Sequence, residues 1–531
     1  MTTVAPYAGA ATLARFALRR DRVRLPVWVL AMGGLVAVQA GQSLELYSEP
    51  GALASYEAAA RGNAAIIATT GPPVGLDTIG GAVAFELWST LAVVVALMTM
   101  FTVARHTRVD EEADRTELLR SARVGRRAPL AAALAVAAVA NLGVLAAVAL
   151  AGTASGLPAA GSLAFGVGVA GIGLVFAGVT AVAAQVMEHG RAVYGVVAAV
   201  LGVSFLLRAA GDIGENGLSW LSPFGWGMAV RPYSEDRWWP LLICLAAASG
   251  LVVLAAVLQD RRDLGAGLVR PRPGAARAGR FLGTALGLAW RLQRAALVAW
   301  LAGVVVTGVA FGAMAPAVES LVEENPALQT VLEEAAGDVV DAYLVIVLVM
   351  LALLAAAYGI SSALRARGEE AAGRAEPVLA TATGRSAWLG SHLVIALAGS
   401  GLLLVLGGAS AGGAYALASA EAGRTVELAL AGAVYVPAVW LLVAATALLF
   451  GAAPRAAAPL AWALLAYCVV MTVLAESFGW PESVRVLSPF EHTPQAPAEV
   501  VTAAPLVLLG GLVVALLAAG LGAFRRRDVA T

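Results

Sequence analysis

The side chains that could do chemistry are concentrated in two short polar segments. The first, RVDEEADRTELLRSARVGRR at residues 108–127, is charged at eleven of its twenty positions. The second, RARGEEAAGRAEPVLATATGR at residues 365–385, is a sparser copy, and both interrupt long apolar runs. Acids and arginines at this density can form a hydrolytic site, can bind a second protein, or can be a solvated loop that only sets membrane topology. We call these segments the first and second islands.

A hydrolytic site is one alternative. Residues 369–374, EEAAGR, match the E-E-x-x-x-R signature of membrane-embedded CAAX-type proteases. Those enzymes also place histidines inside apolar spans, where they bind a metal or activate a water molecule. No F-x-x-x-H element accompanies the four histidines of this chain, and isolated charges are too costly inside a bilayer for the islands to lie there. An intramembrane protease is therefore the least favoured interpretation.

Two nucleotide-binding patterns can be set aside. A P-loop requires G-x-x-x-x-G-K-[ST], whose lysine reaches the β- and γ-phosphates, and the chain contains no lysine. GVGVAG at residues 166–171 matches G-x-G-x-x-G, but it lies inside an apolar run with no preceding strand. Small residues in such a run suit close helix packing instead, and Gly408 and Gly412 are interpreted in the same way.

Apolar helices must position the islands. The chain is 60% hydrophobic and 13% charged, with a mean hydropathy of +0.82, whereas about 25% of residues are charged in a typical soluble domain. Runs of about 20 apolar residues are long enough to cross a bilayer as helices. We expect an all-α polytopic membrane protein with about twelve transmembrane helices, at residues 26–44, 82–104, 129–151, 161–186, 192–210, 239–258, 295–315, 339–364, 389–417, 427–450, 456–476 and 503–523.

The arginines predict the orientation of these spans. If the N-terminus is cytoplasmic and the spans alternate in direction, 29 of the 35 basic residues, all of them arginines, fall on the cytoplasmic side. Such a bias is the known positive-inside rule. The sequence therefore predicts a multi-pass protein of the bacterial cell membrane, with both termini and both islands in the cytoplasm.

The chain contains an internal repeat. Arg108, Asp110, Glu111, Arg115, Glu117, Gly125 and Arg126 recur at a constant spacing as Arg367, Glu369, Glu370, Arg374, Glu376, Gly384 and Arg385. LSPF at 221–224 recurs at 487–490, and DRRD at 260–263 recurs as RRRD at 525–528. We expect two parallel six-span halves, residues 1–264 and 291–531, joined by a cytoplasmic linker at 265–290 that is rich in proline, glycine and arginine.

Each island is expected to form a short amphipathic helix between the second and third spans of its half. Glu111 and Arg115 are four residues apart, as are Glu370 and Arg374, and such pairs stabilise a helix. A glycine, Gly125 or Gly384, is expected to end it. A loop that only sets topology needs arginine alone, whereas these copies also keep acids and glycine in register. A surface that binds a soluble partner explains this better.

The islands and the C-terminal FRRRDV together resemble type-2 ABC transporter permeases. The duplicated twelve-span form is similar to actinobacterial exporters of polyketide and ionophore antibiotics, of the tetronasin-resistance type. The resemblance implies a non-catalytic permease that moves lipophilic or amphipathic compounds by alternating access and has no role in nucleic-acid binding. It implies that each island is a coupling helix bound by a separate ATPase subunit, present in two copies and carrying ATP and Mg²⁺. The residues that match are Asp110, Glu111, Arg115, Glu117, Arg126, Glu369, Glu370, Arg374, Glu376 and Arg385.

Another set of residues could serve the transport pathway or its outer gate. It contains acids near outer span ends and tryptophans of the segment around LSPF, namely Glu86, Trp226, Trp239, Asp341 and Glu476. In the resembled family this segment forms short re-entrant helices that close the outer end of the pathway. The alternative is that the acids cap helices or face water, while the tryptophans lie in the interfacial belt. A proton-coupled secondary transporter remains the alternative to an ATP-driven exporter.

Overall fold

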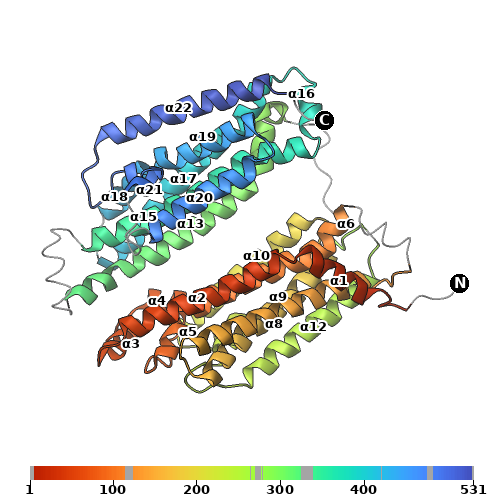
Figure 1. Cartoon of the computed structure of the whole chain (residues 1–531), viewed down its shortest axis with the longest axis vertical. Coiled ribbons are helices and arrows are strands. Elements are labelled where there is room, and N and C mark those ends of the chain that lie inside the picture. The colour runs from red at the N-terminus through yellow and green to blue at the C-terminus, as the bar shows by residue number, and fades with distance from the viewer. Residues whose placement is uncertain are drawn as a thin grey trace. The chain divides into compact units, whose positions relative to one another are not determined.

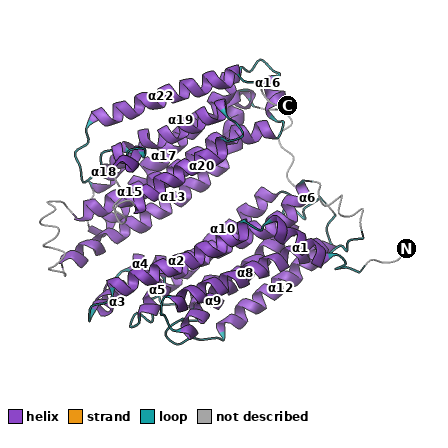
Figure 2. Cartoon of the chain, viewed as in Figure 1, coloured by secondary structure: helices purple, strands orange, loops and turns teal. Residues whose placement is uncertain are grey.

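The computed structural model describes residues 5–113, 123–263, 265–269, 277, 279–323, 339–419, 421, 423–474 and 482–528. These residues form helices joined by turns and loops, and none of them lies in a strand (Figure 2). The chain divides into two compact units, Met1–Pro273 (unit 1) and Gly274–Thr531 (unit 2) (Figure 1). This border falls within the segment expected to be a linker, although the first long helix of unit 2 already begins at Ala285.

Unit 1 has six long apolar helices preceded by an amphipathic one. Short helices follow the first and fifth spans. In order, the elements are α1 (Ala10–Arg20), α2 (Arg24–Leu46), α3 (Ala52–Gly62), α4 (Ala64–Thr70), α5 (Ile79–Ala104), the π-helical turn η1 (Arg105–Val109), α6 (Asp110–Glu112), α8 (Ala128–Ala154), α9 (Ala159–Val186), α10 (Gly190–Ile213), η2 (Gly217–Leu221), α11 (Pro223–Met228) and α12 (Pro240–Asp260).

Unit 2 repeats this order of spans with one visible difference, since its fourth span is divided into two helices before Pro437. The elements are η3 (Arg280–Gly283), α13 (Ala285–Glu323), α15 (Val339–Ala371), α16 (Ala375–Leu379), α17 (Arg385–Ser419), α18 (Arg424–Val434), α19 (Val436–Ala452), α20 (Ala457–Leu474), α21 (Glu482–Arg485), η4 (Pro489–His492) and α22 (Ala503–Arg526).

The expected polytopic all-α architecture is confirmed. Eleven helical segments of the described residues are long and apolar enough to span a membrane, with α18 and α19 counted as one. The one remaining expected span, 456–476, corresponds to α20, whose apolar part, Ala457–Thr472, is shorter. Each of the twelve segments expected from hydropathy coincides with one of these helices. The short helices around LSPF are also present, and Phe224 and Phe490 of the two copies are both buried.

Small residues bring the central helices of each unit together. The most buried spans of unit 1 are α5 and α9, while α12 is among those that expose most of their apolar surface. A Cβ on Gly168 would lie 2.5 Å from the Trp88 ring, and one on Gly408 would lie 2.1 Å from the carbonyl oxygen of Leu428. These close approaches confirm that the glycines of the 166–171 motif and Gly408 serve helix packing.

The expected single helix of the second island is wrong in its bounds. The second span, α15, continues through the acidic pair of the second island to Ala371. The chain then turns at Gly373, whose φ of 69° is left-handed and favours glycine. A separate short helix, α16, follows, so Gly373 rather than Gly384 ends the helix. In unit 1, η1 and α6 likewise prolong α5 to Glu112, while residues 114–122 lie outside the described residues.

Candidate functional site

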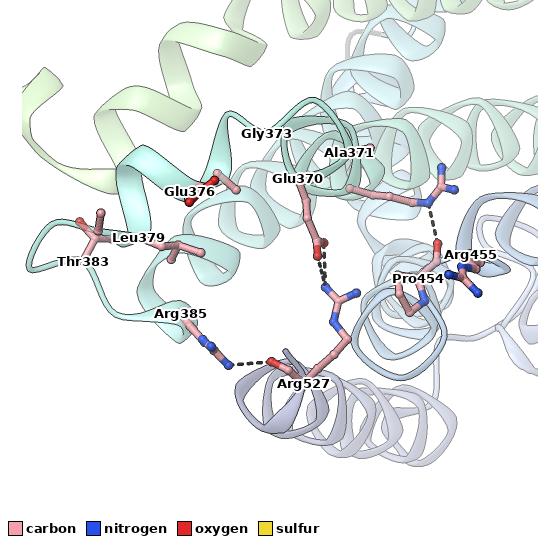
Figure 3. A pocket seen from close by; sticks show the side chains of 13 residues that line it. Glu370, Ala371, Gly373, Glu376, Leu379, Thr383, Arg385, Pro454, Arg455 and Arg527 are labelled. Atoms are coloured by element: carbon pink, nitrogen blue, oxygen red, sulfur yellow. Dashed lines mark hydrogen bonds and ion pairs between the residues drawn. The ribbon is translucent and has the colours of Figure 1, made fainter. Parts of the chain in front are cut away.

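The centre of the second island is an ion pair with the end of the last span. Glu370 lies in the final turn of α15, and Arg527 follows directly after α22. The Arg527 Nη2 donates to both carboxylate oxygens of Glu370, at 3.0 and 2.7 Å (Figure 3). The Glu370 side chain is only 7% exposed and that of Arg527 is 16% exposed. Because the pair is largely shielded from water, it is a stronger connection than a surface ion pair.

The first island makes the equivalent pair. Glu111 accepts hydrogen bonds from Nη1 and Nη2 of Arg262, at 2.8 and 2.9 Å, in a two-pronged arrangement. Arg262 lies just beyond the end of α12, the last span of unit 1. These two side chains are 8% and 9% exposed. In both units, therefore, the second acid of the island binds an arginine that follows the sixth span.

A second pair of contacts joins the other end of each island to the same span. The Nη2 atom of Arg126 donates to the carbonyl oxygens of Gln259, Asp260 and Arg262, at 3.0, 3.3 and 2.8 Å. The Nη1 atom of Arg385 donates to those of Arg525 and Arg527, at 3.2 and 2.6 Å (Figure 3). The last carbonyls of a helix have no partner within it and carry partial negative charge, so an arginine is well suited to bind them.

A third pair of contacts reaches the fourth span. Arg108 is fully buried and donates through Nε and Nη2 to the carbonyl oxygen of Ala184 in α9, at 3.1 and 2.7 Å. Arg367 donates through Nε to the carbonyl oxygen of Pro454, just after α19, at 2.6 Å. Arg108 and its repeat counterpart Arg367 thus each bind the end of the fourth span of their own unit.

We call these three contacts the latch. It consists of Arg108, Glu111, Arg126 and Arg262 in unit 1, and of Arg367, Glu370, Arg385 and Arg527 in unit 2. Every member belongs to a motif that the sequence repeat contains, but sequence reasoning did not bring them together. Both the islands and the arginine motifs DRRD and RRRD recur in the two halves. This shared recurrence was the sequence signal that could have linked them.

The first acid of each island has different partners in the two units. Asp110 accepts from Nη1 of Arg20, at the end of α1, with distances of 2.9 and 2.8 Å. Glu369 instead pairs with Arg365 at 2.8 Å and with Arg374 at 2.7 Å. The expected pair of Glu370 with Arg374 is not made, because the turn at Gly373 removes the four-residue helical spacing.

Part of the second island faces solvent. The side chain of Arg374 is 55% exposed, and Glu376 in α16 is exposed beside it. A hollow of about 620 Å³ lies next to α16. Its wall combines apolar residues with the latch and with the exposed Arg455, as Figure 3 shows. Arg115 and Glu117 of the first island lie outside the described residues.

The expected outer residues have local partners. Glu86 in α5 accepts hydrogen bonds from Gln39 and from the Tyr47 hydroxyl, the latter at 2.9 Å. Burial, and then the charge of Glu86, raise the pKa of Tyr47, which keeps this hydroxyl a donor. Asp341 of unit 2 pairs with Arg424 at 2.8 Å. Glu476 lies outside the described residues.

The two tryptophans belong to one cluster in unit 1. The Trp226 indole donates to the carbonyl oxygen of Trp220 at 2.6 Å, and the rings of Trp220 and Trp239 stack with centroids 5.4 Å apart. Sequence reasoning missed the buried pair of Arg208 and Asp212 at 3.5 Å nearby. Their four-residue spacing at the end of a predicted span was the available signal.

These features define a polytopic membrane protein in which both glutamates of EEAAGR are engaged in ion pairs with arginines. Residues 282–525 match a family model described as the C-terminal domain of multidrug efflux system permease Rv1217c. The whole chain is 41% identical over 529 residues to the multidrug efflux system permease protein Rv1217c of Mycobacterium tuberculosis (strain ATCC 25618 / H37Rv). That alignment covers 98% of this chain and 96% of the relative. The chain therefore belongs to the Rv1217c family of multidrug efflux permeases, which confirms the resemblance to exporter permeases.

Proposed function

We propose that this chain is the membrane subunit of an ATP-driven exporter of lipophilic or amphipathic compounds, antibiotics among them. The observation that carries the proposal is the duplicated island, held by the same three contacts in each unit of a chain that belongs to an efflux permease family. An island that occurs once in each unit, at the ends of the same spans, suits a transporter driven by a pair of ATPase subunits.

The ATPase would be a separate polypeptide. The chain has no lysine and so no P-loop, and two islands suit two copies of an ATPase that carries ATP and Mg²⁺. In this division of tasks the permease has no covalent chemistry and no cofactor of its own. ATP-driven movement of the islands would move the second spans, α5 and α15, and change access to the pathway.

The island residues divide between two roles. Arg374 and Glu376 are exposed, which suits direct contact with the ATPase, and we assign the same role to Arg115 and Glu117. Six others are held within their own unit and would keep the island in position, namely Asp110, Glu111, Arg126, Glu369, Glu370 and Arg385.

We propose a cytoplasmic location for both islands and both termini. The arginine bias favours this orientation. The ion pair of Arg20 with Asp110 and that of Arg527 with Glu370 support it further, because they place the N-terminal helix and the C-terminal segment beside an island. At the opposite span ends, we assign Glu86, Trp226, Trp239, Asp341 and Glu476 to the outer part of the pathway.

The test is drug export with and without the candidate ATPase. The neighbouring gene is expected to encode a P-loop ATPase, and resistance of a drug-sensitive host should require both genes. Replacing the P-loop lysine of the ATPase by alanine should abolish export while the permease still inserts in the membrane. Export by the permease alone, driven by a proton gradient, would refute the proposal and favour a secondary transporter.

A further inference from the structure

The latch has the geometry of a mechanical connection. Each island is joined at its beginning and at its end to the sixth span, through Glu370 and Arg385 in unit 2 and through Glu111 and Arg126 in unit 1. An element attached at two points cannot rotate about either one alone. A displacement of the island must therefore displace the end of the sixth span with it.

Burial makes this connection resistant to exchange with water. The paired carboxylates are 7% and 8% exposed. A buried carboxylate that loses its arginine remains as an uncompensated charge, so an open latch is disfavoured. An exposed ion pair, such as Arg61 with Glu57, can instead exchange with solvent at little cost.

The ion pairs of the latch join residues that are far apart in the sequence. Glu111 and Arg262 are 151 residues apart, and Glu370 and Arg527 are 157 residues apart. The acid beside each, Asp110 or Glu369, has different partners in the two units. What the units share is therefore the connection to the fourth and sixth spans, while the partners of this neighbouring acid differ.

We propose that the latch transmits movement of each island to the fourth and sixth spans of its unit, and that Glu111, Arg262, Glu370 and Arg527 are positioning residues for transport. This inference rests on the proposed function for the source of the movement. It assigns these four residues to transmission, whereas contact with the ATPase falls to the exposed residues of the islands.

The first experiment compares transport with ATP hydrolysis in the purified permease–ATPase complex. Variants E370R and R527E should retain the ATPase subunit and its hydrolysis, while substrate moved per ATP falls by about tenfold, the scale of a typical coupling energy. The charge exchange E370R/R527E should recover to within about threefold of the natural chain. R527K should be impaired because lysine lacks the planar guanidinium, which in Arg527 lies over the rings of Phe450 and Phe524. R485A, which removes an ion pair with Glu491 elsewhere in unit 2, is the matched control.

Two outcomes of this experiment overturn the inference. One is an unchanged ratio of transport to hydrolysis in both single variants. The other is loss of the ATPase from the complex in E370R but not in E376R, because it would place Glu370 rather than α16 at the contact with the ATPase.

A second experiment keeps the inference testable if the single variants do not fold. In a chain whose two cysteines, both buried and free, are replaced by alanine, E370C and R527C are joined by a short bifunctional thiol reagent. Transport should survive the cross-link, since the latch stays closed while it transmits movement, and arrest by the cross-link would refute this. If the natural chain exports without an ATPase, the proposed function fails. The cross-link, read in gradient-driven transport, then still tests the latch.

Discussion

The two islands share one set of attachments and differ in another. In unit 1 a separate helix, α1, ends beside the island, where Arg20 binds Asp110 and the buried Asp21 binds His106 at 2.6 Å. In unit 2, α13 runs unbroken through the region before its span, and the island acid Glu369 is held by two arginines of its own island. The latch is common to both units, so the contacts that join the spans are the ones that are repeated. The contacts of the neighbouring acid, Asp110 or Glu369, are the ones that vary.

Replacing the first arginine of the latch, Arg108 or Arg367, should give the largest difference in lost stability between the units. Arg108 is fully buried and also lies 3.2 Å from Glu111, whereas Arg367 is half-buried. We expect R108A to lower stability by about 3–5 kcal/mol, since it removes a fully buried cation that binds both Glu111 and the carbonyl oxygen of Ala184. R367A, which loses a hydrogen bond to a carbonyl, should cost about 1–2 kcal/mol. Thermal unfolding of the purified proteins measures both, and equal losses would contradict the comparison.

The polar contacts at the start of the first span should give the next largest difference in stability between the units. Asp21 lies beside both His106 and Arg105, at 2.6 and 3.1 Å, so D21A should lower stability by about 3 kcal/mol by leaving Arg105 and the buried His106 without this carboxylate. In unit 2, Gln293 makes neutral hydrogen bonds with His392 and Ser362, and Q293A should cost about 1–2 kcal/mol. The same unfolding measurement applies. A larger loss in Q293A would show that charge is not the difference between the units.

The repeated glycines should differ despite their matching positions. A Cβ on Gly125 would lie 2.3 Å from the carbonyl oxygen of Pro6, whereas a Cβ on Gly384 would have no heavy atom within 4 Å. We expect G125A to cost about 1–3 kcal/mol because the N-terminal segment must shift. G384A should stay within about 0.5 kcal/mol of the natural chain. If both variants are destabilised alike, the two glycines have one structural role after all.

The exposed face of α16 should have the smallest effect on stability. Glu376 is exposed, so E376R should change stability by less than about 0.5 kcal/mol. It should nevertheless weaken retention of the ATPase, because it reverses a charge in the proposed contact. Co-purification of the two subunits measures this, with E421R, an exposed acid elsewhere in unit 2, as the control. Full retention in E376R would remove α16 from the contact surface.

The spans could be predicted from sequence because length and hydropathy are local properties. A run of about 20 apolar residues must become a helix in a bilayer, whatever its neighbours are. The repeat was visible for a similar reason, since it preserves residue types at constant spacing. Helix ends were less predictable, and α15 continues past the expected end because its acids and arginines also suit a helix until Gly373 turns the chain.

The partners of the island residues could not be predicted in this way. Four-residue spacing favoured a pair between Glu370 and Arg374, but the carboxylate binds Arg527 from the far end of the unit. A contact across 157 residues leaves no periodicity in the sequence. The two residues come together because the second and sixth spans both pack against the fourth, α19, and hydropathy does not specify which helices are neighbours.

Helix α1 has a practical consequence for control of the protein. It contacts the first island through Arg20, and it is amphipathic and partly exposed. A compound or antibody fragment that displaced α1 would alter one island and leave the internal pairs of Glu369 in place. Such an inhibitor would disturb unit 1 but not unit 2, and we expect it to lower the rate of export without abolishing it.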